Sequence, residues 1–363
     1  VDYVEQQENP DPDTALDHLF SESDELDKIS SIEPEKTKDK IVMVDSINHA
    51  LSEELEFNKK MIIYGEDVAG DKGGVFTATR GLTKEHGEDR VFNSPLAESS
   101  IIGTAIGLSV VGYKPVVEIQ FGDYIWPAMM QIRNEVATMR YRSGGNWSCP
   151  LVIRVPVGGY IHGSLYHSQS IDGYFAHTPG LKVAYPSNAS DAKGLLKYAC
   201  RCDDPVLFME HKGIYRQGFA SSMEPDENYL LPFGKARIVQ EGSDLTIVTW
   251  GAIVQKAVEA SRNTGKSVEI IDIRTLNPLD IDTILNSIKK TNRVIVAHED
   301  HLTAGFGSEI AAQISGEGFE YLDAPVKRVA SKDVHVAYSP NLENEILVQT
   351  SWIEKEIEEI LTY

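Results

Sequence analysis

Arg90-Val-Phe-Asn-Ser-Pro-Leu-Ala-Glu-Ser-Ser-Ile-Ile-Gly-Thr-Ala-Ile-Gly-Leu-Ser-Val-Val-Gly112 decides the fold, because this mostly apolar segment separates two short strand-like runs. Ser94 and Pro95 have the residue types of a helix N-cap and first helical position, and no charge follows Glu98 before Lys114. The pattern predicts a helix that is buried on all sides. Glu98 at its entrance either interacts with the helix dipole or does chemistry.

Short apolar runs alternate with helical segments along the rest of the chain. The strand-like runs lie at 61–64, 115–119, 151–155, 182–184 and 205–208, and again at 245–249, 268–271, 293–297 and near residue 326. Apolar residues at helical spacing favour helices at 125–141, 188–201, 252–262, 280–290, 307–315 and 345–361. Strands divided by helices are typical of a parallel sheet covered on both faces. We therefore predict an α/β protein with two doubly wound domains in series, at 41–220 and 243–363, joined by a linker at 221–242.

The charge balance limits the possible partners. The 363 residues include 55 Asp and Glu against 34 Lys and Arg, a formal net charge of −21. Nucleic acids and anionic membranes attract basic surfaces, so the sequence argues against both and favours a basic partner. Acidic residues are densest in residues 1–40, which are predicted to be a poorly ordered linker or tail.

The first residues and the cysteines indicate the compartment. No secretory signal pattern opens the sequence, and the apolar stretch near 101–113 is too short to span a bilayer. Cys149, Cys200 and Cys202 do not make an even disulfide framework. We expect a soluble protein of a bacterial cytoplasm or a mitochondrial matrix that is not secreted.

Common catalytic motifs do not occur in this sequence. The glycine-rich stretch after the first strand lacks the spacing of a dinucleotide fingerprint, and there is no Walker lysine, serine nucleophile elbow or metal-ligand motif. Four groups of polar residues remain, each directly after a predicted strand, where open α/β sheets bind ligands. They are Glu66-Asp67, the segment 120–126 with Tyr124 and Trp126, the loop 158–170 with His162 and His167, and His298-Glu-Asp-His301.

Each group has a structural alternative. The carboxylates after the first strand either cap a turn or bind a ligand. Tyr124 or Trp126 either packs in the core or stacks on a planar ring. The repeated glycines around His162 and His167 favour close approach of a ligand over packing.

Gly103 and Gly107 lie one turn apart on one face of the predicted helix. A glycine in a helix interior costs about 1 kcal/mol relative to alanine. Close approach of another helix offsets such a cost, and we expect that helix to come from a second chain.

Seven segments carry a family resemblance that extends from about residue 41 to the end. They are Gly65-Glu-Asp-Val68, Gly73-Gly-Val-Phe76, Arg90 to Glu98, Glu118-Ile-Gln-Phe-Gly-Asp-Tyr-Ile125, Tyr141-Arg-Ser-Gly144, Leu165-Tyr-His-Ser-Gln169 and His177-Thr-Pro-Gly-Leu-Lys-Val183. Together they resemble the β subunit of the thiamine-diphosphate-dependent 2-oxo acid dehydrogenase component. The segments 119–124 and 163–169 look more like the branched-chain (2-oxoisovalerate) members than the pyruvate members.

The resemblance implies a transketolase-like pyrimidine-binding domain followed by a transketolase C-terminal-like domain. It also implies a heterotetramer of two α and two β chains, with a β–β contact and thiamine diphosphate between α and β. The Gly-Asp-Gly motif and later Asn that hold Mg²⁺ and diphosphate in the family do not occur in this sequence. An α subunit or a fused α region must supply them. Residues 1–40 are either the remnant linker of such a fused chain or an acidic tail of another origin.

By the same resemblance, Glu98 matches the carboxylate that bonds N1′ of the aminopyrimidine and Tyr124 the aromatic that stacks on it. His167 matches the histidine that faces the substrate, and Glu66 joins an acidic passage between two active sites. The implied reaction is oxidative decarboxylation of a branched-chain 2-oxo acid, with acyl transfer to a lipoyl group on the dihydrolipoamide acyltransferase core. The alternatives are a pyruvate- or acetoin-specific member and a non-catalytic interface subunit.

Two further features follow from the resemblance. Relatives of this type hold K⁺ near the turn that is Cys200-Arg-Cys-Asp-Asp204 here, which aligns only with a gap. Acidic residues from Glu354 to Glu359 suit docking of a basic module of the acyltransferase, or they form a solvated helix face.

Overall fold

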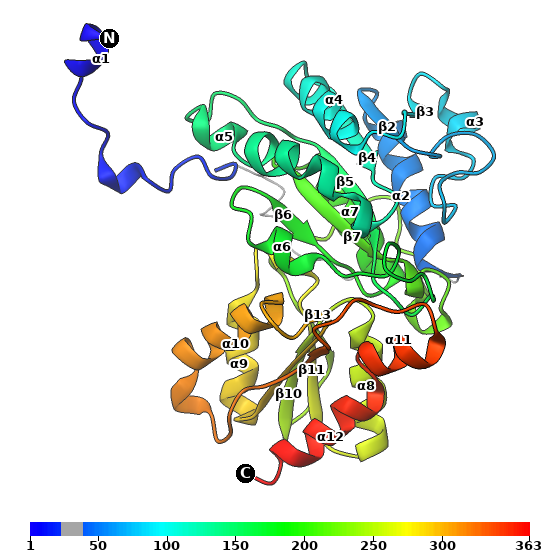
Figure 1. The fold of residues 1–363 in the computed structure, drawn as a ribbon, viewed down its shortest axis with the longest axis vertical. Helices are drawn as coiled ribbons and strands as arrows, with labels where there is room; N and C mark the ends of the chain where they lie inside the picture. The colour runs from blue at the N-terminus through cyan, green and yellow to red at the C-terminus, as the bar shows by residue number, and fades with distance from the viewer. Residues whose placement is uncertain (23–38) are drawn as a thin grey trace.

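The computed structural model describes residues 1–22 and 39–363 (Figure 1). Part of the acidic segment predicted to be poorly ordered, residues 23–38, lies outside the described residues. Within the described part, α1 (Asp2–Glu5) and a short 3₁₀ turn (Pro12–Thr14) contain no buried residue. The chain then reaches the body of the protein, where the Tyr141 hydroxyl donates to Ala15 O (3.1 Å) and Ser21 N donates to Asp204 Oδ1 (2.9 Å).

A first sheet of seven strands has the order β12-β6-β7-β5-β4-β2-β3. All neighbours are parallel except β12 and β6. The strands are β2 (Met61–Gly65), β3 (Val91–Asn93), β4 (Lys114–Glu118), β5 (Val152–Val157), β6 (Lys182–Ala184), β7 (Val206–His211) and β12 (Thr275–Asn277).

Helices cover both faces of this sheet because successive strand residues point to opposite sides. Ile62 and Tyr64 face one core, with α4 (Glu98–Val110) and the helical segment 126–142, which consists of a 3₁₀ turn, a π-helical stretch and α5 (Met139–Arg142). Met61 and Ile63 face the other, with α2 (Met43–Phe57) and α7 (Ala189–Arg201). The short helices α3 (Leu82–His86) and α6 (Asp172–Ala176) lie in the connections.

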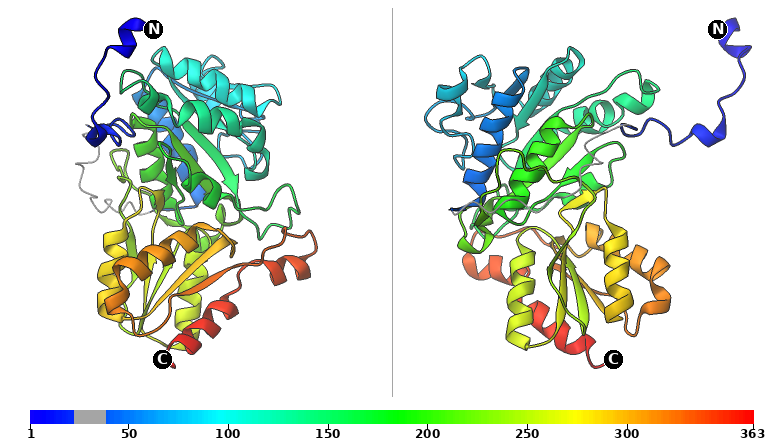
Figure 2. Two further views of the ribbon diagram at one scale, coloured as in Figure 1. Left: turned by 60° about the vertical axis from the view of Figure 1, so that its left-hand side comes forward. Right: turned by 180° about the vertical axis from the view of Figure 1, so that it is seen from behind.

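A second sheet of five strands has the order β14-β13-β10-β11-β9. Its strands are β9 (Arg237–Gln240), β10 (Leu245–Thr249), β11 (Val268–Asp272), β13 (Val294–His301) and β14 (Lys327–Ser331). Helices α8 (Ile253–Thr264) and α12 (Thr350–Ile360) cover one face, and α9 (Ile281–Thr291) and α10 (Phe306–Glu317) cover the other (Figure 2). The predicted α/β fold with two doubly wound domains is confirmed.

The structure differs from the expectations at several boundaries. The predicted linker contains β9, which pairs antiparallel with β11, and β8 (Ser222–Met223), which pairs with β1 (Lys40–Ile41). The predicted final helix is two helices, α11 (Pro340–Ile346) and α12, because buried Leu347 and Val348 connect them outside any helix. Strand β12 lies within the second half of the sequence yet completes the first sheet.

Two predictions about the α4 segment are wrong. The helix begins at Glu98, not at Ser94, because Ser94 N–H donates to Gly65 O (2.7 Å) and the Ser94 hydroxyl donates to Pro95 O (3.1 Å). Nor is α4 buried on all sides in the single chain: Gly103 and Gly107 are exposed. A Cβ placed on either glycine meets no atom of another described element within 4 Å.

No helix of residues 1–22 and 39–363 is long and apolar enough to cross a membrane.

Candidate active site

The four predicted site residues gather at the carboxyl edge of the first sheet. Glu66 follows β2, Glu98 begins the helix after β3, Tyr124 ends a 3₁₀ turn after β4, and His167 lies in the loop after β5. Parallel strands end at a common edge, so these connections meet there. The Tyr124 hydroxyl lies 2.7 Å from His167 Nε2, and Glu66 interacts electrostatically with both Glu98 and Tyr124.

Glu66 is a buried carboxyl group without a full set of partners. Its side chain is 4% exposed, and its Oε1 has no hydrogen-bond partner among the described residues. Burial, together with the charges of Glu98 and Asp67, raises the pKa of Glu66. An unsatisfied buried carboxyl in a cluster of like charges is typical of a ligand site.

Asp67 has a structural role instead. Its carboxylate pairs with Lys72 (2.6 Å) and accepts from Gln120 Nε2 (3.3 Å), and its carbonyl accepts from Gly74 N (2.7 Å). The turn-capping alternative therefore describes Asp67, whereas Glu66 remains available for a ligand.

The His167 ring is held in one orientation. Its Nδ1 lies 3.1 Å from Gly163 O, so Nδ1 carries the hydrogen and Nε2 accepts from the Tyr124 hydroxyl. The ring of Phe121 contacts the imidazole edge-on, with 4.5 Å between ring centroids. Burial, with the charges of Asp123, Glu66 and Glu98, raises the pKa of Tyr124, so its hydroxyl keeps its proton near neutral pH.

The remaining aromatic and histidine candidates lie outside this group. Trp126 packs against Tyr174 and Phe175 (centroid distances 4.9 and 6.3 Å), but it is 41% exposed and is therefore not a core residue. His162 Nδ1 lies 2.6 Å from Glu343 Oε2, in the second domain. His298 is buried flat against Trp250 (5.2 Å), and burial lowers its pKa to about 4, which makes it a neutral packing residue.

A buried ion cluster under the site was missed at the sequence level. Arg154, in β5, is fully buried and bonds Glu118 of β4 (2.8 Å) and both carboxylate oxygens of Glu210 of β7 (2.7 and 2.8 Å). The signal was present, because Arg154 is a charge inside an otherwise apolar strand. This cluster ties together three adjacent strands whose ends carry the site.

The turn proposed for K⁺ already has cationic partners. Lys114 Nζ donates to Cys202 O (2.7 Å), and Lys182 Nζ lies 3.0 Å from Asp204 Oδ2. Arg140 Nε is 3.4 Å from the other oxygen of Asp204. Cationic side chains therefore already bind Cys202 O and the Asp204 carboxylate, which argues against a monovalent cation at these atoms. In the described ranges, no group of three or more His, Cys, Asp or Glu is placed to hold a metal.

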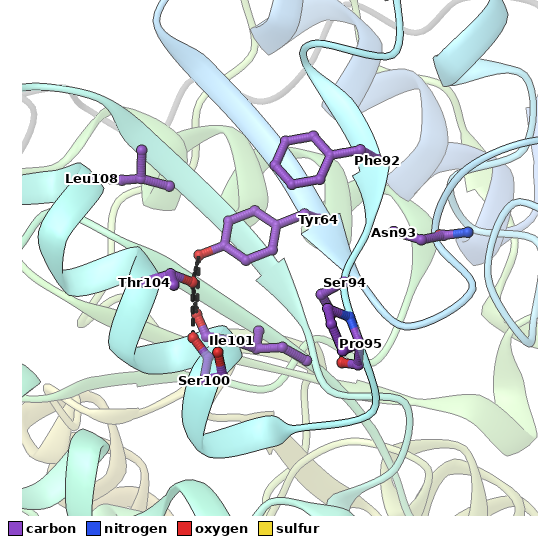
Figure 3. Close-up of a pocket in the computed structure, with 9 residues that line it drawn as sticks. All are labelled: Tyr64, Phe92, Asn93, Ser94, Pro95, Ser100, Ile101, Thr104 and Leu108. Carbon is purple, nitrogen blue, oxygen red and sulfur yellow. Dashed lines mark hydrogen bonds between the residues drawn. The ribbon is translucent and has the colours of Figure 1, made fainter.

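A separate pocket of about 240 Å³ lies between α4 and the β3 edge (Figure 3). The Tyr64 hydroxyl donates to Ile101 O (3.0 Å) and lies 2.8 Å from the Thr104 hydroxyl, while the Tyr64 ring stacks on Phe92. None of the four predicted site residues lines it. The pocket therefore belongs to the exposed side of α4, beside the site.

Matches over both halves of the chain identify a protein of the transketolase type. The transketolase pyrimidine-binding domain matches residues 39–217, and the transketolase C-terminal domain matches residues 234–353. A solved structure of a split-gene transketolase, an inactive β4 tetramer, is similar in fold, with a TM-score of 0.70 and 22% identity over 89% of this chain and 98% of that one.

Sequence relatives narrow the class. The chain is 45% identical over 324 residues to 2-oxoisovalerate dehydrogenase subunit beta of Bacillus subtilis, covering 88% of this chain and 98% of that protein. It is also 45% identical over 302 residues to the pyruvate dehydrogenase E1 component subunit beta of the same organism, covering 82% and 92%. The chain belongs to the family of 2-oxo acid dehydrogenase E1 β subunits.

Proposed function

We propose that this chain binds the aminopyrimidine half of thiamine diphosphate in a branched-chain 2-oxo acid dehydrogenase component. The observation that carries the proposal is Glu66 Oε1, a buried oxygen without a hydrogen-bond partner in the described part of the chain, next to Glu98. Two neighbouring carboxyl groups suit a ring whose nitrogen must hold a hydrogen. Tyr124 lies near both carboxyl groups and is hydrogen-bonded to His167.

When bound, thiamine diphosphate would supply a nucleophilic carbon for the keto group of a 2-oxo acid and an electron sink for the loss of CO₂. Glu98 holds a proton at N1′ of the pyrimidine, and Tyr124 packs against the ring. His167 gives or takes a proton at the substrate. In acyl transfer, the electron pair left on the acyl carbon by the loss of CO₂ forms a bond to one sulfur of the lipoyl disulfide. The S–S bond breaks, the other sulfur keeps the electron pair of that bond and takes a proton, and the acyl group is released from the cofactor.

An α subunit or a fused α region holds the other half of the cofactor in this proposal. The sequence lacks the Gly-Asp-Gly motif and later Asn that hold Mg²⁺ and diphosphate in the family, so the proposal assigns the diphosphate and its metal to another polypeptide segment. The proposal does not include a K⁺ ion, because Lys114 binds Cys202 O and Lys182 binds the Asp204 carboxylate in the turn where it was expected.

The experiment that tests the function mixes this chain with the α subunit of a branched-chain dehydrogenase. Thiamine diphosphate is titrated with and without Mg²⁺, and turnover is measured on 2-oxoisovalerate, pyruvate and acetoin. We expect tight binding only with both chains and Mg²⁺, and fastest turnover on 2-oxoisovalerate. Faster turnover on another substrate would select that family member, and absence of cofactor binding would favour a non-catalytic interface subunit.

The exposed side of α4 is proposed to contact another chain. Replacing Gly107 by Leu should stabilise the isolated chain by up to about 1 kcal/mol, since the added Cβ meets open space and leucine favours helix. The same side chain should weaken assembly about 10- to 100-fold through overpacking, measured by sedimentation velocity.

Gly316→Leu is the matched control for this variant. Gly316 lies in α10, and a Cβ there also meets no atom of another described element within 4 Å. It should gain the same helix stability without any loss of assembly. Unchanged assembly of Gly107→Leu would remove α4 from the interface.

Transfer of the acyl group to a lipoyl group of the acyltransferase core also belongs to the proposal. Helix α12 is the candidate docking site for a basic module of that acyltransferase. Two of its carboxylates share one cation within the chain, since Lys327 Nζ lies 3.5 Å from Glu356 Oε2 and 2.5 Å from Glu359 Oε1. Helix α12 therefore has fewer unpaired carboxylates for electrostatic docking than the sequence indicates.

A bacterial cytoplasm or a mitochondrial matrix remains the proposed compartment. One relative is a mitochondrial protein of Dictyostelium discoideum.

A further inference from the structure

The loop that carries His167 has an unusual backbone. Residues 158–171 connect β5 to α6, and three non-glycine residues in the loop have positive φ angles: Tyr160 (60°), His162 (57°) and Ser164 (64°). Such conformations cost free energy and persist only where surrounding structure imposes them. The contacts that hold this loop therefore determine where His167 points.

Carboxylates of the second domain supply those contacts. Glu299 Oε1 accepts from Gly159 N (2.6 Å), and Glu343 Oε1 accepts from His162 N (3.1 Å). At the far end, Asp300 Oδ2 accepts from Gly173 N (3.2 Å). We call Glu299, Asp300 and Glu343 the carboxylate clamp.

Side-chain contacts strengthen the clamp at the same points. His162 Nδ1 lies 2.6 Å from Glu343 Oε2, and the Tyr160 hydroxyl donates to Val348 O (2.8 Å). Two of the three residues with positive φ are thus bound directly to the segment 343–348.

The clamp carboxylates are buried, with exposed fractions of 6% for Glu299, 5% for Asp300 and 1% for Glu343. Burying a carboxylate is costly unless specific partners offset the loss of water. Burial favours the neutral form of Glu299, but His211 (2.6 Å) and the Gly159 N–H hold its pKa below the usual range. Glu299 is therefore kept charged at the domain boundary, where it binds this loop.

We propose that Glu299 and Glu343 are positioning residues that fix the His167 loop for acyl transfer to the lipoyl disulfide. The second domain then determines where His167 lies without touching the cofactor. The catalytic part of this inference rests on the proposed function of His167. The positional part rests only on contacts within this chain.

The first test measures the loop in the chain alone. Glu343→Ala should raise the rate of chymotrypsin cleavage after Tyr166, an exposed residue of the loop, about tenfold or more. Glu343→Gln, which keeps an oxygen for His162 N, should fall between this variant and the wild type. The control is Glu269→Ala, which removes a buried carboxylate that pairs with Lys290 and makes no contact with the loop.

The second test uses the complex with the α subunit. Glu343→Ala should lower lipoyl-linked turnover about 10- to 100-fold, because small misplacements of a reacting group cost rate. Thiamine diphosphate affinity, and decarboxylation measured with a dye as electron acceptor, should stay within about twofold. His167→Ala is the reference variant and should lose lipoyl-linked turnover at least as strongly as Glu343→Ala.

The outcomes distinguish failure of the proposed function from failure of the carboxylate clamp. If the wild-type complex neither binds thiamine diphosphate nor decarboxylates a 2-oxo acid, the proposed function fails, and the cleavage rates still decide the clamp. If Glu343→Ala is cleaved at the wild-type rate and keeps lipoyl-linked turnover, the inference is overturned. A parallel loss of cofactor affinity, dye-linked turnover and melting temperature in Glu343→Ala would also overturn it, since that pattern belongs to a purely structural role.

Discussion

Glu98→Gln is expected to lower turnover by about 10²- to 10⁴-fold in the complex with the α subunit, the usual contribution of a positioned acid or base. The amide keeps the shape of the carboxyl group but cannot hold a proton at a ring nitrogen. Folding should be little affected, because Glu98 is only partly buried and no side-chain hydrogen bond caps the helix that it begins. Steady-state turnover with saturating thiamine diphosphate and Mg²⁺ measures the effect.

The control is Glu88→Gln, the same chemical change at an exposed residue of the same domain. It should retain wild-type turnover. Thiamine diphosphate affinity separates loss of chemistry from loss of binding. Turnover of Glu98→Gln close to that of Glu88→Gln would remove Glu98 from the reaction.

Arg154→Met is expected to have the largest effect on stability, a loss of about 3–5 kcal/mol in the free energy of unfolding. The substitution leaves Glu118 and Glu210 buried without the guanidinium that pairs with both. Urea denaturation measures the loss. Arg142→Met is the control, because Arg142 and its partner Glu135 are about half exposed, and a surface pair contributes at most about 1 kcal/mol.

The loss in Arg154→Met should depend on pH in a defined direction. Burial raises the pKa of Glu118 even with Arg154 present, and removing the guanidinium removes the main opposing influence. A carboxyl whose pKa is raised in the folded state favours folding at low pH, and this contribution is lost as pH rises through the folded pKa. The difference in stability between the variant and the wild type should therefore be smallest at acid pH and should grow as pH rises through the folded-state pKa of Glu118. A pH-independent difference would contradict this account.

Local patterns predicted the fold well where strands are fully buried. Strand β10 matches the predicted run 245–249, and Glu66, Tyr124 and His167 were placed together because each follows a parallel strand. The start of α4 was mispredicted because Ser94 continues the edge of β3 by bonding Gly65 O, a contact between residues far apart in sequence. Residue type alone does not reveal which of two local roles a serine adopts.

Pairings across the domain boundary could not be predicted. Glu343 lies in a polar stretch that has the composition of a surface helix, yet it is 1% exposed and meets His162. Nothing local distinguishes it from Glu345, whose side chain is largely exposed. The segment from His298 to His301 gave only a weak signal, since exposed His–Glu pairs are common. Only the fold shows that Glu299 and Asp300 bind backbone N–H groups of the other domain.

Strand β12 has a consequence for how this protein can be divided. Residues 275–277 lie between strands of the second sheet in sequence, yet they complete the edge of the first sheet beside β6. A fragment that ends between the two domains would leave β6 as an open edge, which invites pairing with other chains. The two domains therefore cannot be exchanged independently between enzymes. A chimera that takes its second half from another enzyme must also contain an edge strand that pairs with β6.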